Sequence, residues 1–85
     1  MNYFTQFWDE ERDDENASWG TSTWYFETNE EDEVIKQVTI YQSGKTLKYS
    51  AENVEDEFGG LCMDTLTIDD CDGDVISKEE FYNVW

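Results

Sequence analysis

The stretch EVIKQVTIYQSGKTLKYS, from Glu33 to Ser50, constrains the fold more than any other part of the chain. It is rich in β-branched and aromatic residues, which fit the pleated surface of a sheet. Gly44 lies near its middle and can adopt the positive φ that tight hairpin turns require. We therefore predict two antiparallel strands joined by a two-residue loop, Ser43-Gly44.

A two-residue loop also fixes which side chains face each other. Ile40 then pairs with Leu47 and Val38 with Tyr49, so these four side chains share one face of the sheet. A shift of the pairing by one residue would separate them. The side chains that we expect on this single core face are those of Trp24, Phe26, Val34, Val38, Ile40, Leu47 and Tyr49.

Two earlier segments also have the pattern of strands. They run from Tyr3 to Trp8 and from Thr21 to Thr28, and both are rich in aromatic residues and threonine. Strands that follow each other in the chain usually lie side by side, which favours a meander. Further on, we expect Asn53 to Gly60 to be a loop, and Leu61 to Met63 with Leu66 to Ile68 to add a short edge strand.

The C-terminal segment carries the signals of a helix. In Ser77-Lys78-Glu79-Glu80 the Ser77 hydroxyl can accept a hydrogen bond from the Glu80 amide, while the Glu80 carboxylate reaches back, which is a capping box. We predict a helix from Ser77 to Trp85 with an apolar stripe that docks on the sheet. The expected fold is α+β: an antiparallel sheet of about four strands, in a meander, with this helix packed on one face.

The composition indicates one small domain, residues 1–85, with an extreme charge. There are 22 acidic and five basic residues and no histidine, which gives a formal net charge of −17. Four Trp, five Tyr and five Phe supply apolar surface for a small core. Because nucleic acids and anionic membranes are polyanions, this charge argues against direct binding to either. It favours a basic protein partner or a cation.

The acidic residues gather in four clusters, which we predict to bind the partner. The residues concerned are Asp9, Glu10, Glu11, Asp13, Asp14 and Glu15; Glu30, Glu31, Asp32 and Glu33; Glu55, Asp56 and Glu57; and Asp69, Asp70, Asp72 and Asp74. Aromatic side chains beside such clusters often anchor an interface, and we consider Trp19 and Tyr25 for that role. The alternative explanation of the charge is a surface that serves solubility alone.

Catalysis has little support in the sequence. The chain has no histidine, the usual general base near neutral pH, and no glycine-rich phosphate loop. The segment Asp70 to Phe81 resembles an EF-hand calcium loop, but the glycine expected after the third acid is missing, so Phe81 falls where the closing glutamate belongs. We therefore predict no enzyme, no cofactor and no metal ligand.

The favoured function is a non-enzymatic, immunity-type inhibitor of a basic toxin or nuclease. The alternative is a DNA-mimic inhibitor, of the phage anti-defence type, that occupies the nucleic-acid site of another protein. A calcium-binding module is the third hypothesis. The first two predict tight binding that weakens with salt and involves no turnover.

Two features concern the compartment. Cys62 and Cys71 are too few for a disulfide scaffold, and we expect reduced thiols rather than a bridge. The start, MNYFTQFWDEE, lacks the basic end and apolar run of a signal peptide, and no apolar stretch is long enough for a membrane helix. We expect a cytoplasmic protein.

Two motifs together resemble a family of small acidic bacterial domains of unknown function. They are the hairpin EVIKQVTIYQSGKTLKYS and the helix ISKEEFYNVW from Ile76 to Trp85; members of the family end in a similar I-S-x-E-E-F-x-x-x-W helix. The chain departs from the family pattern in its loop from Asp69 to Asp74 and in its lack of proline. The resemblance implies an α+β domain without known catalysis, and it defines no site.

Overall fold

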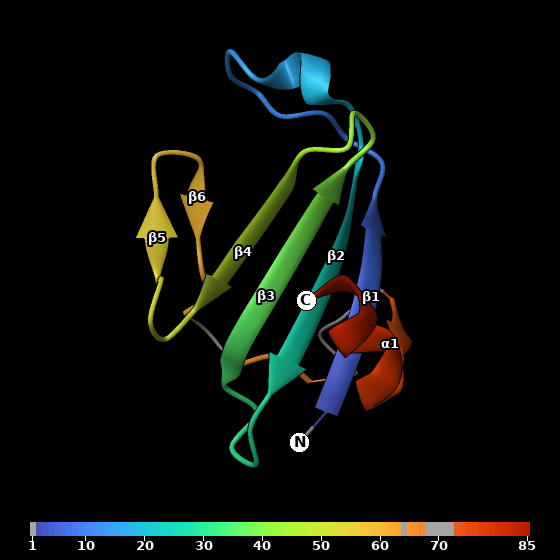
Figure 1. Cartoon of the computed structure of the whole chain (residues 1–85), viewed down its shortest axis with the longest axis vertical. Helices are drawn as coiled ribbons and strands as arrows, with labels where there is room; N and C mark the ends of the chain where they lie inside the picture. The colour runs from blue at the N-terminus through green and yellow to red at the C-terminus, as the bar shows by residue number, and fades with distance from the viewer. Residues whose placement is uncertain (1, 64, 68–72) are drawn as a thin grey trace.

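Five antiparallel strands form one sheet in the computed structural model, which describes residues 2–63, 65–67 and 73–85 (Figure 1). The strand order is β4-β3-β2-β1-β7, so the first four strands form the predicted meander. The sheet consists of β1 (Asn2–Trp8), β2 (Ser22–Thr28), β3 (Val34–Tyr41), β4 (Thr46–Ser50) and β7 (Asp74–Val75). The α+β class is confirmed, with five strands in place of about four, because the short β7 pairs with the outer edge of β1.

The smaller elements lie beside this sheet. A 3-10 helix, η1 (Ala17–Trp19), lies near the β3–β4 turn, and α1 (Lys78–Val84) packs in front of β1 and β2 (Figure 1). The predicted capping box is present: the Ser77 hydroxyl accepts a hydrogen bond from the Glu80 amide at 3.1 Å, and the Ser77 amide donates to the Glu80 carboxylate at 3.4 Å. The helix therefore begins where the sequence predicts.

The pairing of β3 with β4 differs from the predicted register by one residue. The loop between them has three residues and ends at Gly44 with φ of 96°; the Tyr41 amide donates to the Lys45 carbonyl at 2.8 Å. A type I turn followed by a left-handed glycine is the usual form of such a loop. As a result Leu47 lies opposite Thr39, and Val38 lies opposite Lys48.

The core consequently has two sides, and the predicted single core face is wrong. One side, the helix face, buries Tyr3, Val38 and Phe81, with Ile40 and Trp85 packed against them. The other side, the loop face, is covered by the chain that follows β4. It buries Phe4, Phe26 and Val34 together with Tyr41, Leu47 and Tyr49. Val38 and Ile40 are thus separated from the other five residues expected beside them.

A β-bulge explains why side chains two or four residues apart along β3 do not all lie on the same face, as the prediction assumed. The register between β2 and β3 shifts between Glu27 and Thr28: Glu27 lies opposite Lys36, while Thr28 lies opposite Val34. Ile35 is the extra residue. A bulge reverses the faces on its two sides, so Val34 lies on the loop face although Val38 lies on the helix face.

The segment after β4 is more ordered than the predicted loop. It forms a small hairpin of β5 (Glu55–Asp56) and β6 (Gly59–Gly60). Asp56 organises its turn by accepting hydrogen bonds from the Phe58 and Gly59 amides and from the Tyr49 hydroxyl. The amide and hydroxyl donors hold the pKa of Asp56 below its ordinary value. This hairpin covers the loop face beside β4.

The predicted edge strand after this hairpin is not found among the described residues. Residues 61–63 and 66–67 are not in strands, and Thr65 makes an isolated bridge with Glu33. Ile68 lies outside the described residues. The edge strand that the sheet does gain is β7, formed by Asp74 and Val75 against Thr5 and Phe4.

Candidate partner-binding site

The acidic clusters predicted to bind a partner lie at different ends of the molecule. The cluster from Asp9 to Glu15 follows β1, whereas the one from Glu30 to Glu33 forms the turn between β2 and β3, at the opposite end of the strands (Figure 1). The cluster from Glu55 to Glu57 belongs to the β5–β6 hairpin. Since the molecule is 36 Å long, the first two clusters do not meet in one flat interface. The third lies nearer the first, because Trp19 packs on Phe58 of the hairpin with ring centres 5.3 Å apart.

Some of the predicted residues have structural roles instead. Besides Asp56, Asp14 accepts hydrogen bonds from Arg12 and from the Asn16 amide, chiefly Arg12, and these hold the pKa of Asp14 below its ordinary value. Glu33 accepts from the Asn29 side chain, and Asp74 pairs in β7. Asp69, Asp70 and Asp72 lie outside the described residues. The exposed remainder comprises Asp9, Glu10, Glu11, Asp13, Glu15, Glu30, Glu31, Glu55 and Glu57, with Asp32 partly buried.

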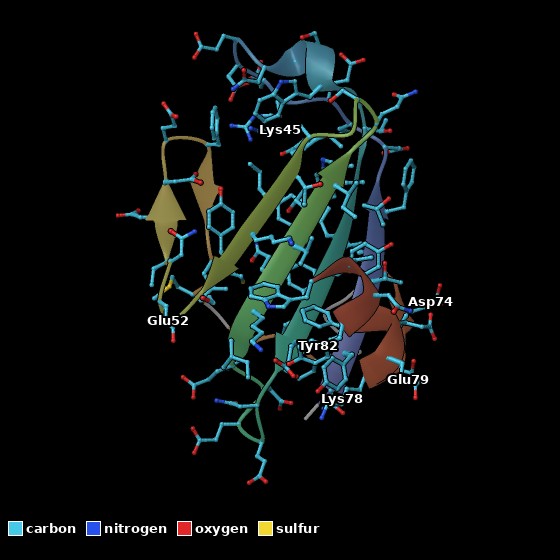
Figure 2. The ribbon with its side chains drawn as sticks, in the orientation of Figure 1. Lys45, Glu52, Asp74, Lys78, Glu79 and Tyr82 are labelled. Atoms are coloured by element: carbon cyan, nitrogen blue, oxygen red, sulfur yellow. The ribbon has the colours of Figure 1, made fainter. Side chains whose placement is uncertain are left out.

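Most of the cations are occupied within the chain. Arg12 lies 5.4 Å from the Trp19 ring centre and donates to the Tyr41 hydroxyl. Lys45, labelled in Figure 2, lies 5.6 Å from the centre of the same Trp19 ring. Lys48 donates to the backbone oxygen of Trp85. Cations over aromatic faces are held there by the ring quadrupole. These three basic side chains therefore leave most of the carboxylates at the surface uncompensated.

Lys36 is occupied in the same way on the helix face. Its amino group lies 4.8 Å from the centre of the Tyr82 ring and 2.9 Å from the Tyr82 hydroxyl. It also lies 3.8 Å from Glu27. Within the described residues, Asp14 and Glu27 are the side-chain carboxylates that come within ion-pair distance of a cation. Glu27 is buried, so the exposed acids that the structure describes, other than Asp14, have no cationic neighbour at that distance.

A groove opens on the loop face beside the first acidic cluster. Trp8, Trp24, Phe26 and Gln6 line a cavity of about 310 Å³. Trp8 and Trp24 also line a second cavity of about 190 Å³, whose rim includes Glu10 and Glu11. We call the two adjoining cavities the tryptophan groove. Here two exposed acids of one cluster border an open aromatic surface that contains no lysine.

The pairing of β1 with β2 builds this groove. Gln6 lies opposite Trp24, and Trp8 lies opposite Ser22, so these side chains project from the same face. The Trp24 indole N–H donates to the Ser22 hydroxyl at 2.8 Å, and its ring stacks on Phe26 with centres 6.1 Å apart. The floor is therefore an apolar surface whose indole N–H is already satisfied. Trp8 forms a wall with 47% of its surface exposed.

A network of cations and rings holds the rim. Two guanidinium nitrogens of Arg12 donate hydrogen bonds to the Asp14 carboxylate, at 2.7 and 3.0 Å, and a third donates to the Tyr41 hydroxyl on β3. Trp19 packs edge-on against Tyr41 with ring centres 5.1 Å apart, and its carbonyl accepts from the Ser43 amide. The acidic loop is thus attached to the β3–β4 turn, which fixes Glu10 and Glu11 beside the groove.

The aromatic residues proposed from sequence occupy other places. Trp19 is partly buried in this network, and Tyr25 packs on the helix face. The exposed aromatic residue beside the acids is Trp8, which the prediction missed. The sequence could have indicated this role for Trp8, because Trp8 is the last residue of an alternating strand and the acidic cluster begins at the next residue. Phe7, 63% exposed, lies on the opposite face of β1.

The calcium-loop hypothesis depends on three alternating acids, Asp70, Asp72 and Asp74, of which only Asp74 is described. Asp70, Cys71 and Asp72 lie outside the described residues, so the hypothesis stays a prediction, as does the state of the two cysteines. In the described part, the Glu80 carboxylate is used by the capping box. No helix among the described residues has the length and apolar character needed to cross a membrane.

Comparisons of the chain with protein-family models, with curated proteins and with solved structures found no match. The resemblance to small acidic bacterial domains therefore stays a prediction, and the function has to be argued from the geometry.

Proposed function

We propose that this chain is a non-enzymatic acidic protein that binds and inhibits a basic protein, such as a toxin or nuclease, in the manner of an immunity protein. The observation that supports this proposal is that most basic side chains contact groups of their own chain rather than the exposed carboxylates. Arg12, Lys36, Lys45 and Lys48 are engaged with rings, hydroxyls or a backbone oxygen of their own chain. The exposed carboxylates consequently present a nearly unopposed negative charge.

Such a charge distribution has a physical use in binding. A strong negative field raises the rate of encounter with a positively charged protein, and a contact surface that excludes water then sets the lifetime of the complex. The same field repels nucleic acid and anionic lipid. The proposal therefore names a protein that carries a basic surface, for example the substrate cleft of a nuclease.

The test is a capture experiment followed by an activity assay. The immobilised chain is incubated with a lysate of the organism that encodes it, at low and at high salt, and the retained proteins are identified. We expect a basic toxin or nuclease that is retained at low salt, released at high salt, and inhibited by the soluble chain. Retention of no basic protein at low salt would contradict the proposal.

A DNA competition arm separates immunity-type binding from mimicry of DNA. If duplex DNA displaces the chain from the captured enzyme, the chain occupies the nucleic-acid site. If DNA does not displace it while inhibition persists, the chain binds elsewhere on the enzyme. A matched chain with Glu30→Gln and Glu31→Gln measures how much of the retention comes from the far end of the molecule.

A further inference from the structure

We infer that the tryptophan groove is the anchoring pocket of this interface, and that it receives an apolar side chain of the basic partner while Glu10 and Glu11 hold the lysines or arginines that flank it. This inference rests on the proposed function and deepens it. Of the acidic clusters, it assigns the one that follows β1, Asp9 to Glu15, to the centre of the interface with the partner.

The lining of the groove selects an apolar side chain. Its floor is the stacked pair of Trp24 and Phe26, and the Trp24 N–H is already bonded to Ser22. A volume of about 310 Å³ lies at the lower end of ordinary ligand pockets, which span about 300–1,000 Å³. The pocket therefore suits one or two side chains. Trp8, which is 47% exposed, would lose its contact with water when a side chain enters.

The charge around the groove selects the residues next to that side chain. Glu10 and Glu11 are exposed and line the second cavity together with Arg12. Arg12 does not neutralise them, because its guanidinium is paired with Asp14 at 2.7 Å and bonded to Tyr41. Two carboxylates thus border an apolar pocket without a cation of their own. A segment with a basic residue on either side of an apolar one matches this arrangement.

A second copy of the chain fits the groove poorly. Each copy carries a net charge of −17, and pairing two grooves would bring Glu10 and Glu11 of one copy towards those of the other. Like charges across an interface oppose association. Nucleic acid is disfavoured by the same charge. A basic protein segment relieves the charge and fills the pocket at the same time.

The Arg12 and Trp19 network supports this assignment because it preorganises the rim. The loop that carries Glu10 and Glu11 is attached to Tyr41 through Arg12 and to the β3–β4 turn through the Trp19 carbonyl. A rim that is already ordered loses little conformational freedom when a partner binds. The cluster from Glu30 to Glu33, at the other end of the strands, borders neither cavity of the groove.

Two synthetic peptides test the inference without a known partner. One is a short peptide of lysine and arginine with a single central leucine, and the other carries alanine in place of leucine; both have a fluorescent label. Binding is measured by fluorescence anisotropy at low salt. We expect the leucine peptide to bind about tenfold more tightly than the alanine peptide, because it buries more apolar surface.

Matched variants locate the contact. Trp8→Ala should remove the preference for leucine. Phe7→Ala should leave it unchanged, because Phe7 is an even more exposed aromatic residue but lies on the other face of β1. Glu10→Gln with Glu11→Gln should weaken binding of both peptides several-fold more than Glu30→Gln with Glu31→Gln, which removes the same charge at the far end. Circular dichroism confirms that each variant is folded.

The outcomes separate the two proposals. If both peptides bind wild type equally and Trp8→Ala changes nothing, the groove is not the anchor, although the basic-partner proposal stands. If neither peptide binds at low salt, the basic-partner proposal fails and the groove assignment fails with it. Sedimentation that reveals a dimer abolished by Trp8→Ala would replace the basic segment with a second copy.

Discussion

The Tyr82 hydroxyl on α1 lies 3.0 and 3.1 Å from the two carboxylate oxygens of Glu27 on β2 and donates to them across the helix–sheet interface (Figure 2). Glu27 is 2% exposed, and the same hydroxyl accepts a hydrogen bond from Lys36. A buried carboxylate needs such partners, because leaving it without them is costly. This network also explains Lys36, a charged residue in the midst of an apolar strand.

Removing the Tyr82 hydroxyl should therefore destabilise the fold. Tyr82→Phe keeps the ring but leaves Glu27 with fewer donors, and we expect a loss of about 1–2 kcal/mol in the free energy of unfolding, measured with urea. Tyr25→Phe is the matched control, because the Tyr25 hydroxyl makes no hydrogen bond within the described residues. Equal stability of the two variants would show that the Tyr82 contact contributes nothing.

The Tyr3 hydroxyl should make the fold sensitive to alkali. Hydrogen bonding to the Glu27 carboxylate, together with burial, raises the pKa of Tyr3 to about 12, against about 10 in an unfolded chain. A group with a raised folded pKa contributes stability that is complete below the unfolded value and is lost as the pH rises towards the folded value. We expect stability to fall between about pH 10 and 12. Thermal melts of wild type and Tyr3→Phe check this, since the variant should lose less over that interval.

Arg12 should hold the acidic loop in place. Arg12→Ala removes the contacts with Asp14, Tyr41 and the Trp19 ring, so the amides of residues 14–20 should exchange with solvent at least several-fold faster. Hydrogen exchange followed by mass spectrometry measures this. Arg12→Lys keeps the charge but not the planar fork and should give an intermediate result. Unchanged exchange in Arg12→Ala would mean that the loop is held by other contacts.

Gly44 should be required by the three-residue turn. Its φ of 96° is unfavourable for any residue with a Cβ, although an added Cβ at this position would meet no atom within 4 Å. Gly44→Ala should therefore cost about 1–2 kcal/mol through backbone strain alone. Gly59→Ala is a suitable comparison, because Gly59 has an ordinary φ and its Cβ would make only normal contact with Tyr49. Denaturant unfolding of both variants gives the difference.

Local signals in the sequence were sufficient for the order and type of the main elements. The helix start followed from the Ser77 capping box, and the meander followed from alternating strands that are neighbours in the chain. Composition alone gave the net charge of −17 and hence the class of partner that we propose. The helix start and the strand order depend on residues close together in the chain, and the net charge depends only on how many residues of each type the chain contains.

The tertiary structure decided which residues share a face and which acids meet an aromatic surface. A third loop residue at the β3–β4 turn and a bulge at Ile35 each shifted the strand pairing by one residue, which moved side chains to the opposite face. The alternation of residues along the chain reveals neither shift. The tryptophan groove depends on the pairing of Trp8 with Ser22 and Gln6 with Trp24, residues that are far apart in sequence. Long-range pairing is set by the packing of the whole sheet. For that reason the sequence was enough to give the net charge, whereas only the fold brought Glu10 and Glu11 beside an aromatic groove.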